Sequence, residues 1–390
     1  MSAASDLAVA ARADALDRLR VATRGMRVAL VHEWLSAPTG SEQTFAAMAR
    51  LLPNAELFAL SHNRSCRLDF GDRKVRTSAL DARAQRGGRA ALLPLMPTAM
   101  RRLAWGQTFD VVVTSSHAFS RAFAADQSGI HLSYTYTPVR YVWYPELERQ
   151  RSRIAVPAAV LRGFQALDRR HARGVRSFAA ISSEVQHRIQ QCYGRPSTVV
   201  HPPCDVDFFT PPPIPLERNG AIIAGRLVSY KRVDLAIRAC AATDIDLTVI
   251  GEGPERHALE ALAETVAPGR VHFAGRISRA RLRDAYRSAA VVLFPAVEDF
   301  GIVPVEAQAC GAPVVAIGAG GALETVLAHS GAFAPYQEVD PFAAAIRLTI
   351  DSPPASVACR EHAARFSTES FERAFAGWVI DGLGDAAGAS

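Results

Sequence analysis

Residues 298–326 read EDFGIVPVEAQACGAPVVAIGAGGALETV, and this stretch decides the fold expected for the chain. A buried-strand pattern precedes it, Gly301 permits a close backbone approach, and Pro304 suits the first turn of a helix. A strand that leads into a helix N-terminus offers unpaired N–H groups and a partial positive charge to a phosphate. Glu298, before the helix, and Glu306, one turn into it, can accept hydrogen bonds from hydroxyl groups. We therefore expect a socket for a phosphate flanked by two sugars.

The same alternation of strand, glycine turn and helix continues through the second half. It predicts strands at 221–225, 247–251 and 271–275 and helices at 232–242 and 279–289. Arg226 and Lys231 bracket the turn after the first of these strands. Strands and helices that alternate with short connections are typical of a parallel sheet covered on both faces, so we expect an α/β domain here.

The first half shows a similar alternation with longer connections. It predicts strands at 27–31, 56–60, 74–77, 110–115, 130–136, 177–182 and 197–201 and helices at 155–174 and 183–193. Prolines are dense at 202–213, where the alternation is lost, which marks a domain boundary. We therefore expect an N-terminal extension (1–25), a first Rossmann-like domain (26–205), a linker (206–217), a second Rossmann-like domain (218–365) and a C-terminal helix packing back on the first domain (366–390).

Length and composition fit a two-domain protein without a disulfide framework. A chain of 390 residues is too long for one core, and an apolar content of 49% excludes disorder. The six cysteines form no CxxC pair, which is typical of a reducing compartment. Residues 1–25 lack the apolar segment of a signal peptide, and no apolar run approaches the ~20 residues of a transmembrane helix. We expect a cytoplasmic protein.

Charge is distributed unevenly along the chain. Residues 1–200 hold 28 basic and 15 acidic side chains, whereas residues 201–390 hold 16 and 23. The basic excess of the first half indicates an anionic partner. A bilayer surface or a phosphorylated lipid fits better than nucleic acid, because basic and aromatic residues do not interleave. Only Lys74 and Lys231 are lysines, and at Lys231 we expect a compact ammonium to be required rather than a planar guanidinium.

Residues 82–105 alternate arginines with leucines and methionines, and Pro94 and Pro97 exclude one continuous helix through them. The segment could lie on a membrane surface, with leucines and Met100 inserted shallowly and the arginines at acidic headgroups. It could equally be a solvated pair of helices whose leucines enter the core. The arginines concerned are Arg83, Arg86, Arg89, Arg101 and Arg102.

Three positions near strand ends in the first half are candidates for ligand contact. His117 follows the strand at 110–115, at the edge where open α/β sheets bind ligands, although a structural hydrogen bond would also explain it. The glycine turn from Pro38 to Glu42 leads into a helix, and a plain helix cap would look the same. The aromatic-rich loop 138–146, with Arg140 and Glu146, either walls an acceptor or is a packed connection.

Several motifs in a fixed order resemble glycosyltransferase family 4, in its mannosyltransferase-like branch of bacterial surface polysaccharide biosynthesis. In the second half they are EDFGIVPVEAQACGAPV (298–314), GR with the later lysine (225–231) and VIGEGPE (249–255). In the first half they are VALVHEWL (28–35), SSHA (115–118), TPVRYVW (137–143) and HPPCDVDFF (201–209). The resemblance covers roughly residues 26–380, and the order of independent motifs argues against chance.

The resemblance implies a GT-B fold, with two doubly wound parallel-sheet domains facing each other across a cleft. Arg226 and Lys231 would hold the donor diphosphate. Glu306 would bind the ribose hydroxyls, Glu298 the donor sugar, and His117 the transferred sugar. The other implied donor-binding residues are Phe300, Gly301, Ile302, Val303, Gly225 and Gly251, and the acceptor or donor-sugar side is assigned to Gly40, Ser41, Glu42, Arg140 and Trp143. Family members usually carry a second glycine where this chain has Ser41. The Ser41 Cβ could narrow the acceptor side of the site, or its hydroxyl could add a polar group there.

The implied reaction is a metal-independent hexosyl transfer with retention, without a cofactor. Breaking a nucleotide–sugar bond develops negative charge on the diphosphate, which fixed cations stabilise most in the transition state. No Asp-x-Asp lies at a strand end to hold a divalent metal. The branch implies GDP-mannose as the donor and a lipid-linked or saccharide acceptor in lipopolysaccharide, capsule or exopolysaccharide synthesis. Alternatives are a UDP-sugar-dependent transferase, a nucleotide-sugar epimerase, a phosphorylase and a non-enzymatic nucleotide-sugar-binding subunit.

Overall fold

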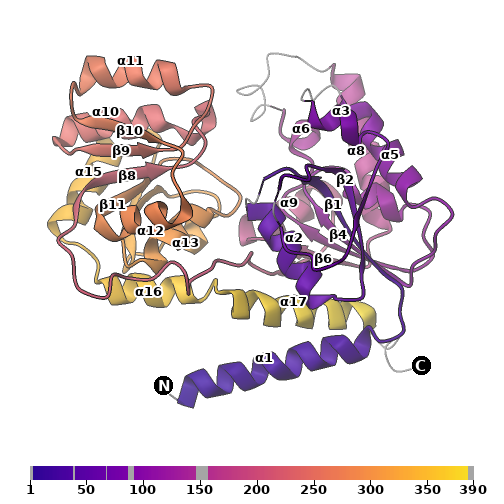
Figure 1. The fold of residues 1–390 in the computed structure, drawn as a ribbon. Helices are drawn as coiled ribbons and strands as arrows, with labels where there is room; N and C mark the ends of the chain where they lie inside the picture. The colour runs from indigo at the N-terminus through magenta and orange to yellow at the C-terminus, as the bar shows by residue number, and fades with distance from the viewer. Residues whose placement is uncertain (1–2, 38–39, 67, 87–91, 146–156, 385–390) are drawn as a thin grey trace. The chain divides into compact units, whose positions relative to one another are not determined.

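The computed structural model describes residues 3–37, 40–66, 68–86, 92–145 and 157–384. The chain divides into two compact units, and each is described by itself (Figure 1). Unit 1 comprises Met1–Glu148, Ile154–Pro203 and Glu369–Ser390, and unit 2 comprises Arg149–Arg153 and Cys204–Thr368. Three residues named above, Pro38, Arg89 and Glu146, lie outside the described residues.

Unit 1 is built on a parallel sheet whose described strands have the order β3-β2-β1-β4-β5-β6-β7. In chain order the elements of the unit are α1 (Ala3–Ala22), β1 (Val28–Leu35), α2 (Gly40–Leu51), β2 (Glu56–His62), β3 (Val75–Thr77), α3 (Asp81–Gln85), η1 (Leu93–Leu95), α5 (Met96–Leu103), β4 (Val111–Ser116), η2 (Ser120–Ala124), β5 (Ile130–Thr135), α6 (Arg140–Trp143), α8 (Ala158–Arg173), β6 (Ser177–Ala180), α9 (Ser183–Tyr193), β7 (Thr198–Val199) and α17 (Thr368–Leu383). The chain winds outward from β1 to β3 and then returns to β4, which pairs with the other edge of β1. Ligands bind such sheets where the winding reverses, at the carboxyl ends of β1 and β4.

One face of this sheet is covered by η1, α5 and η2. Met100 of α5 is fully buried in a cluster with Phe58 and Phe123, and Leu92 is buried in the same cluster. The expectation that Met100 inserts into a membrane is therefore wrong, because this side chain fills the core. Leu95, by contrast, is 51% exposed. Within the described ranges, no helix combines the length and apolarity needed to cross a bilayer.

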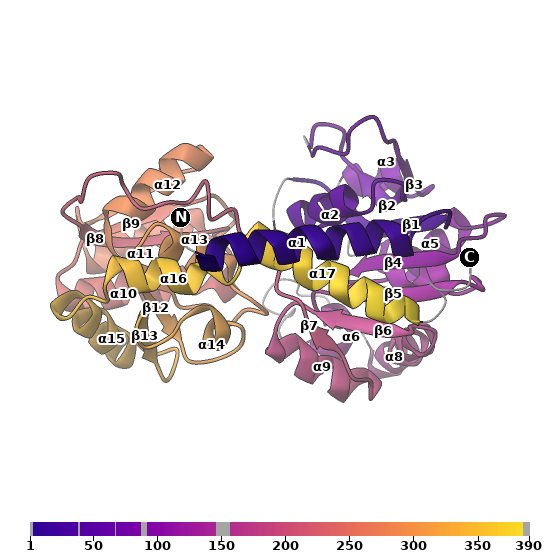
Figure 2. The same ribbon diagram turned by 90° about the horizontal axis from the view of Figure 1, so that it is seen from below.

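The opposite face is covered by α17, which lies across β5 and β6 with α1 beside it (Figure 2). The α17 rings in contact with the ring of Tyr134 are those of Phe371, Phe375 and Trp378. The Trp378 indole also donates a hydrogen bond of 3.0 Å to Ser177 Oγ in β6. Arg12 of α1 donates to Glu372 of α17 at 2.6 Å. A segment that follows unit 2 in the sequence thus completes the core of unit 1.

Unit 2 is built on a second parallel sheet, with the described strands in the order β10-β9-β8-β11-β12-β13. Its elements are β8 (Asn219–Ala224), η3 (Ser229–Lys231), α10 (Val233–Thr243), β9 (Leu247–Ile250), α11 (Arg256–Val266), β10 (Val271–Gly275), α12 (Arg279–Ser288), β11 (Ala289–Phe294), α13 (Ile302–Ala309), β12 (Val314–Ile317), α14 (Ala322–Thr325), β13 (Gly331–Ala334), α15 (Val339–Asp351) and α16 (Ser356–Ala364). Buried side chains of β8, β9, β11 and β12 pack with those of α10 and α15 in one core. The winding reverses between β8 and β11, so this pair marks the expected ligand edge. Two doubly wound parallel sheets confirm the expected α/β class.

The strand ends differ in places from those predicted. β1 runs to Leu35, so His32 to Leu35 belong to the strand rather than following it, because the pairing with β2 continues to Leu35 opposite His62. The strands β12 and β13 were not among those predicted. β12 lies inside the stretch 298–326, which was interpreted as a ligand socket and not searched for a further strand.

Candidate active site

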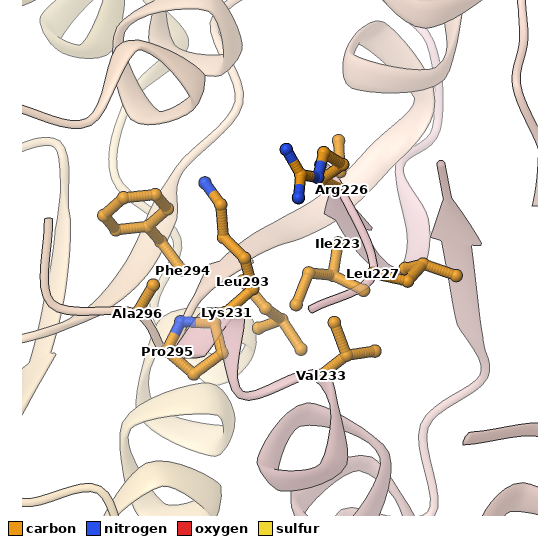
Figure 3. A pocket seen from close by; sticks show the side chains of 11 residues that line it. Ile223, Arg226, Leu227, Lys231, Val233, Leu293, Phe294, Pro295 and Ala296 are labelled. Atoms are coloured by element: carbon orange, nitrogen blue, oxygen red, sulfur yellow. The ribbon is translucent and has the colours of Figure 1, made fainter. Parts of the chain in front are cut away.

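The ligand edge of unit 2 contains two cationic side chains (Figure 3). Gly225 follows β8 with a φ of 150°, and Arg226 comes next. Lys231 ends η3, and its ammonium lies over Gly225, since a Cβ at this glycine would be 3.8 Å from Lys231 Nζ. Phe294 and Pro295, at the end of β11, line the same pocket. The nitrogen ends of both basic side chains lie on the same side of the pocket in Figure 3.

The two cations differ in their partners. The Lys231 ammonium forms an ion pair with the Glu298 carboxylate, and these side chains are only 17% and 21% exposed. Lys231 Nζ is also 5.9 Å from the centroid of the Phe294 ring. Arg226 is exposed, and its guanidinium makes no hydrogen bond or ion pair with a described residue. One positive charge is therefore balanced inside the unit, and the other is available to an anion from solution.

The helix α13 begins beside this pair. Gly301 precedes it with a φ of 92°, a conformation that favours glycine, and a Cβ there would lie 3.0 Å from the Phe294 ring. The side chain of Phe300 is buried, whereas Ile302 and Val303 in the first turn are half-buried. Contacts from this loop to a phosphate would thus come from backbone N–H groups of the helix N-terminus and not from the Phe300 ring.

Gly251 serves the packing of two loops. It follows β9 with a φ of 136°, and a Cβ there would lie 1.8 Å from the carbonyl oxygen of Gly225. Gly253 approaches the Leu227 carbonyl in the same way, at 2.1 Å. The loop after β9 therefore supports the loop that carries Arg226, and the glycines are required by this close approach.

Glu306 lies one turn into α13 and is half-buried. Burial raises its pKa to about 7 and nearby Asp205 acts in the same direction, while Arg279 and the Tyr286 hydroxyl oppose the shift. That hydroxyl donates to Glu306 Oε2 at 3.4 Å. The Arg279 guanidinium donates to Asp205 at 2.8 Å and lies 4.2 Å from the Phe208 ring centroid. A carboxylate near half-ionisation at neutral pH thus lies at the position predicted to bind ribose hydroxyls.

The ligand edge of unit 1 contains two histidines and a buried glutamate. His117 follows β4, and its Nδ1 lies 3.1 Å from Glu33 Oε2. His32 is fully buried, with its ring centroid 5.4 Å from that of His117. Among the described residues, His32, Glu33 and His117 form the one group whose ligand atoms, all within 4.8 Å of one another, could hold a metal ion. Glu33 already accepts backbone N–H groups of the segment after β4, so these contacts favour a hydrogen-bonded cluster.

The first turn of α2 adjoins this cluster. Ser41 Oγ donates to Glu42 Oε2 at 3.0 Å, and Glu42 is buried. The Tyr136 hydroxyl donates to the Ser41 carbonyl oxygen at 3.0 Å. The Ser41 hydroxyl therefore fixes the Glu42 carboxylate, which the glycine usual at this position could not do. Gly40, the first residue of α2, is exposed.

Trp143 has a different environment from the one expected of a sugar-stacking ring. Its indole N–H donates to Asp168 Oδ2 at 2.8 Å, and the Arg169 guanidinium lies 4.6 Å from the ring centroid. Asp168 also accepts from buried Arg121 at 2.7 Å. These contacts attach α6 to α8. Arg140, at the start of α6, is half-buried.

Residues 207–366 match the family model described as glycosyl transferases group 1. This part of the chain is similar to group 1 glycosyl transferases. The resemblance to a glycosyltransferase family is confirmed for this part of the chain, and the mannosyltransferase-like branch stays a prediction.

Curated relatives match part of the sequence. The chain is 36% identical over 190 residues to the D-inositol 3-phosphate glycosyltransferase of Mycolicibacterium smegmatis, covering 43% of this chain and 44% of the relative. It is 36% identical over 193 residues to the protein of that name from Mycobacteroides abscessus, covering 44% and 43%. The chain thus spans less than half the length of the curated relatives it matches.

Solved structures resemble nearly the whole chain. Anabaena Alr3699/HepE, in complex with UDP, is 19% identical with a TM-score of 0.70, covering 91% of this chain and 100% of that one. Sucrose-phosphate synthase from Thermosynechococcus elongatus is 18% identical with a TM-score of 0.70, covering 92% of this chain and 100% of that one. The lipopolysaccharide outer core galactosyltransferase WaaB is 16% identical with a TM-score of 0.66, covering 91% of this chain and 99% of that one. At these identities the likeness establishes the fold, which is GT-B.

The structure brings most of the predicted site residues together within their own units. In unit 2, Arg226 and Lys231 line one pocket, and Glu298 forms an ion pair with Lys231. In unit 1, His117 lies in a cluster with His32 and Glu33, which the first turn of α2 adjoins. Glu33 and His32 were missed by sequence reasoning, although two adjacent polar residues at the end of an apolar strand were a usable signal.

Proposed function

We propose that the chain is a hexosyltransferase that transfers a sugar from a nucleotide-sugar donor with retention of configuration and without a metal ion. The observation that carries this proposal is the Lys231–Glu298 ion pair beside Arg226, at the reversal point of a glycosyl transferase domain. A nucleotide sugar supplies the two chemistries that this arrangement suits, an anionic diphosphate and an adjacent polyhydroxylated ring.

Different residues bind different parts of the donor. Lys231 and Arg226 neutralise the charge that develops on the leaving diphosphate, in a partly shielded site where the interaction is stronger than in water. When the diphosphate pairs with the Lys231 ammonium, the Glu298 carboxylate accepts hydrogen bonds from sugar hydroxyls instead of from Lys231. Glu306 accepts from the ribose hydroxyls, and His117 contacts the transferred sugar. The acceptor hydroxyl gives its proton to the donor phosphate.

Two donor classes compete. Resemblance to the mannosyltransferase-like branch favours GDP-mannose or a close GDP-hexose. Anabaena Alr3699/HepE was solved with UDP, and this favours a UDP-sugar as the second candidate. Thermal unfolding with each donor class separates them: a rise in the melting temperature with UDP-sugars and none with GDP-mannose would overturn the first choice.

The test of the proposal is charge removal at the pocket. Lys231→Ala and Arg226→Ala should each lower turnover on the order of 100-fold, because leaving-group stabilisation is lost. Lys231→Arg should not restore the wild-type rate, since a planar fork does not replace a point donor. The control is Arg281→Ala, which removes an exposed arginine of α12 in the same unit. Full activity in Lys231→Ala would contradict the assigned role, and loss of activity in EDTA would contradict metal independence.

We further propose that unit 1 attaches to an anionic membrane surface, where a lipid-diphosphate-linked saccharide is the acceptor. Arg83, Arg86, Arg101 and Arg102 are exposed, as is Trp105 at 80%. Each basic side chain near an anionic leaflet contributes about 1 kcal/mol, which salt screens.

Vesicle co-sedimentation tests this attachment. Binding should require anionic lipid, weaken as salt rises, and fall when these four arginines become glutamine while the fold is retained. Equal binding to neutral vesicles, or none, would remove the membrane from the proposal.

A further inference from the structure

Arg232 has a backbone conformation that a residue with a Cβ does not favour. Among the residues that the structure describes, only Arg232 and Asp244 have a positive φ without being glycine. Asp244 lies at the end of α10, where a left-handed residue is common, whereas Arg232 lies at its beginning. The residue before a helix ordinarily has extended backbone, but Arg232 has a φ of 51° and a ψ of 42°. The start of α10 therefore holds a strained turn.

This turn joins two helices through a single residue. The Arg232 backbone N–H donates to the Ser229 carbonyl oxygen at 3.1 Å, which closes η3. The Arg232 carbonyl oxygen accepts the Leu235 backbone N–H at 3.1 Å, which opens α10. Because η3 ends at Lys231 and α10 begins at Val233, Arg232 alone changes the direction of the chain. Right-handed helical backbone at this position would orient the backbone of Lys231 differently relative to α10.

The turn directly follows the paired cation of the donor pocket. Lys231 reaches over Gly225, where a Cβ would be 3.8 Å from Nζ, and its ammonium pairs with the Glu298 carboxylate. A long, flexible side chain makes both contacts only if its backbone is fixed in place. The helix α10 is itself fixed, because Val233 in its first turn is buried in the core of unit 2. The backbone of Arg232 therefore links a fixed helix to Lys231.

The Arg232 side chain supports this backbone conformation. Its guanidinium donates to the Asp234 carboxylate, from Nε to Oδ1 at 3.1 Å and from Nη2 to Oδ2 at 3.2 Å. Asp234 lies in the first turn of α10, where the helix N-terminus also favours a carboxylate. The pair thus stabilises a left-handed turn that glycine would adopt without support.

We infer that Arg232 is a positioning residue whose left-handed backbone, held by Asp234, sets the direction of the Lys231 ammonium in the donor pocket. The guanidinium acts on the turn and not on the donor. Glycine should therefore replace arginine at this position, whereas a β-branched residue should not. The inference rests on the proposed function, in which Lys231 neutralises the diphosphate, and it names the residue that positions that cation.

Amine labelling of the full chain reports on Lys231 without any donor. Lys231 is half-buried and ion-paired, while Lys74, the only other lysine, is exposed and serves as the internal reference. An N-hydroxysuccinimide ester is added at pH 8, and peptide mass spectrometry follows each lysine. In Arg232→Val the labelling rate of Lys231 relative to Lys74 should rise about 3- to 10-fold, because the ammonium is released from its pair.

The same ratio should stay at its wild-type value in Arg232→Gly, because glycine adopts the left-handed turn freely. A raised ratio in Arg232→Gly overturns the inference, and this arm holds even if the valine variant does not fold. An unchanged ratio in folded Arg232→Val overturns it as well.

Asp234→Ala tests the support that the ion pair gives to the turn. In the wild-type background this change should raise the Lys231 labelling ratio. In the Arg232→Gly background it should have no effect, because the glycine turn needs no side-chain partner. An equal effect of Asp234→Ala in both backgrounds would refute the role assigned to the pair.

Kinetics provide the link to turnover. In an active enzyme, kcat of Arg232→Val should fall on the order of 10- to 100-fold with a smaller change in KM for the donor, because a displaced Lys231 stabilises the leaving group less. Arg232→Gly should rescue most of this loss. An equal loss of kcat in both variants would overturn the inference, because it would assign the guanidinium itself to the donor. Since labelling requires no donor, a chain that proves inactive as a transferase can still support the positioning of Lys231, and the two failures are distinguishable.

Discussion

Replacing Glu306 by glutamine should stabilise the protein at pH 8 and leave its stability at pH 4 unchanged. The carboxyl has a pKa of about 7 in the fold, against an ordinary value of 4.5, chiefly because burial disfavours its charged form. Its neutral form therefore fits the folded state better than its ionised form does. Glutamine has nearly the same shape and cannot ionise.

The sign and size follow from proton linkage. A carboxyl whose pKa is higher in the folded than in the unfolded state contributes its full stabilisation at a pH below the unfolded-state pKa. This stabilisation is lost as the pH rises through the folded-state pKa. The shift from 4.5 to about 7 corresponds to a cost of about 3 kcal/mol once the group is ionised. The difference in free energy of unfolding between Glu306→Gln and wild type should thus be small at pH 4, grow between pH 4.5 and 7, and level off above that range.

Urea unfolding of both proteins from pH 4 to pH 8 measures this difference. Glu264→Gln is the matched control, since Glu264 is an exposed carboxylate on α11 of the same unit. Its difference from wild type should stay near zero at every pH. A Glu306→Gln difference that is flat with pH, or one that favours wild type at pH 8, would refute the account of Glu306 as a carboxylate strained by burial.

Four further results are expected. Affinity for the nucleotide sugar should fall on the order of 10-fold from pH 8 to pH 6 by calorimetry, because binding to ribose hydroxyls uses the ionised Glu306; equal affinities would contradict this role. Arg279→Gln removes the main charge that lowers the Glu306 pKa, so the pH step in the unfolding comparison should move upward. Gly251→Ala should cost about 2 kcal/mol or more in urea unfolding, given the 1.8 Å approach to the Gly225 carbonyl, whereas Gly163→Ala, in open space on α8, should be neutral or stabilising. Trp143→Phe should cost about 1–3 kcal/mol of unfolding free energy, because buried Asp168 loses a donor; unchanged stability with lost activity would restore the stacking role.

The fold of each unit was largely predictable from local patterns. Apolar runs of four to six residues that end in glycine turns predict parallel strands, whereas the strand order, with its reversal points at β1–β4 and β8–β11, is known only from the structure. The edge of the second sheet was missed, because β12 lies inside the stretch interpreted as a ligand socket and β13 follows it. The segment with Met100 was ambiguous because a methionine between arginines fits both a membrane face and a core.

The candidate site was predictable where a residue lies at a strand end. Arg226, Lys231 and Glu298 follow β8 or β11 directly, so topology alone places them near one another. Their ion pairing was not predictable, since it depends on side-chain reach across a loop. Glu33 and Trp143 were harder still. The environment of the Glu33 carboxylate is set by backbone N–H groups far along the chain. The orientation of the Trp143 ring is set by Asp168 in another helix.

The position of α17 in the chain has a consequence for biosynthesis. This helix covers Tyr134 and Ser177 of unit 1, yet the ribosome makes it only after all of unit 2. At the usual rate of translation the wait is roughly 10 to 30 s. During that time the apolar face of β5 and β6 lacks its covering helix and is open to chaperones or to other nascent chains. Unit 2 has no such gap among its described elements, so the second unit to be started is the first that can finish folding.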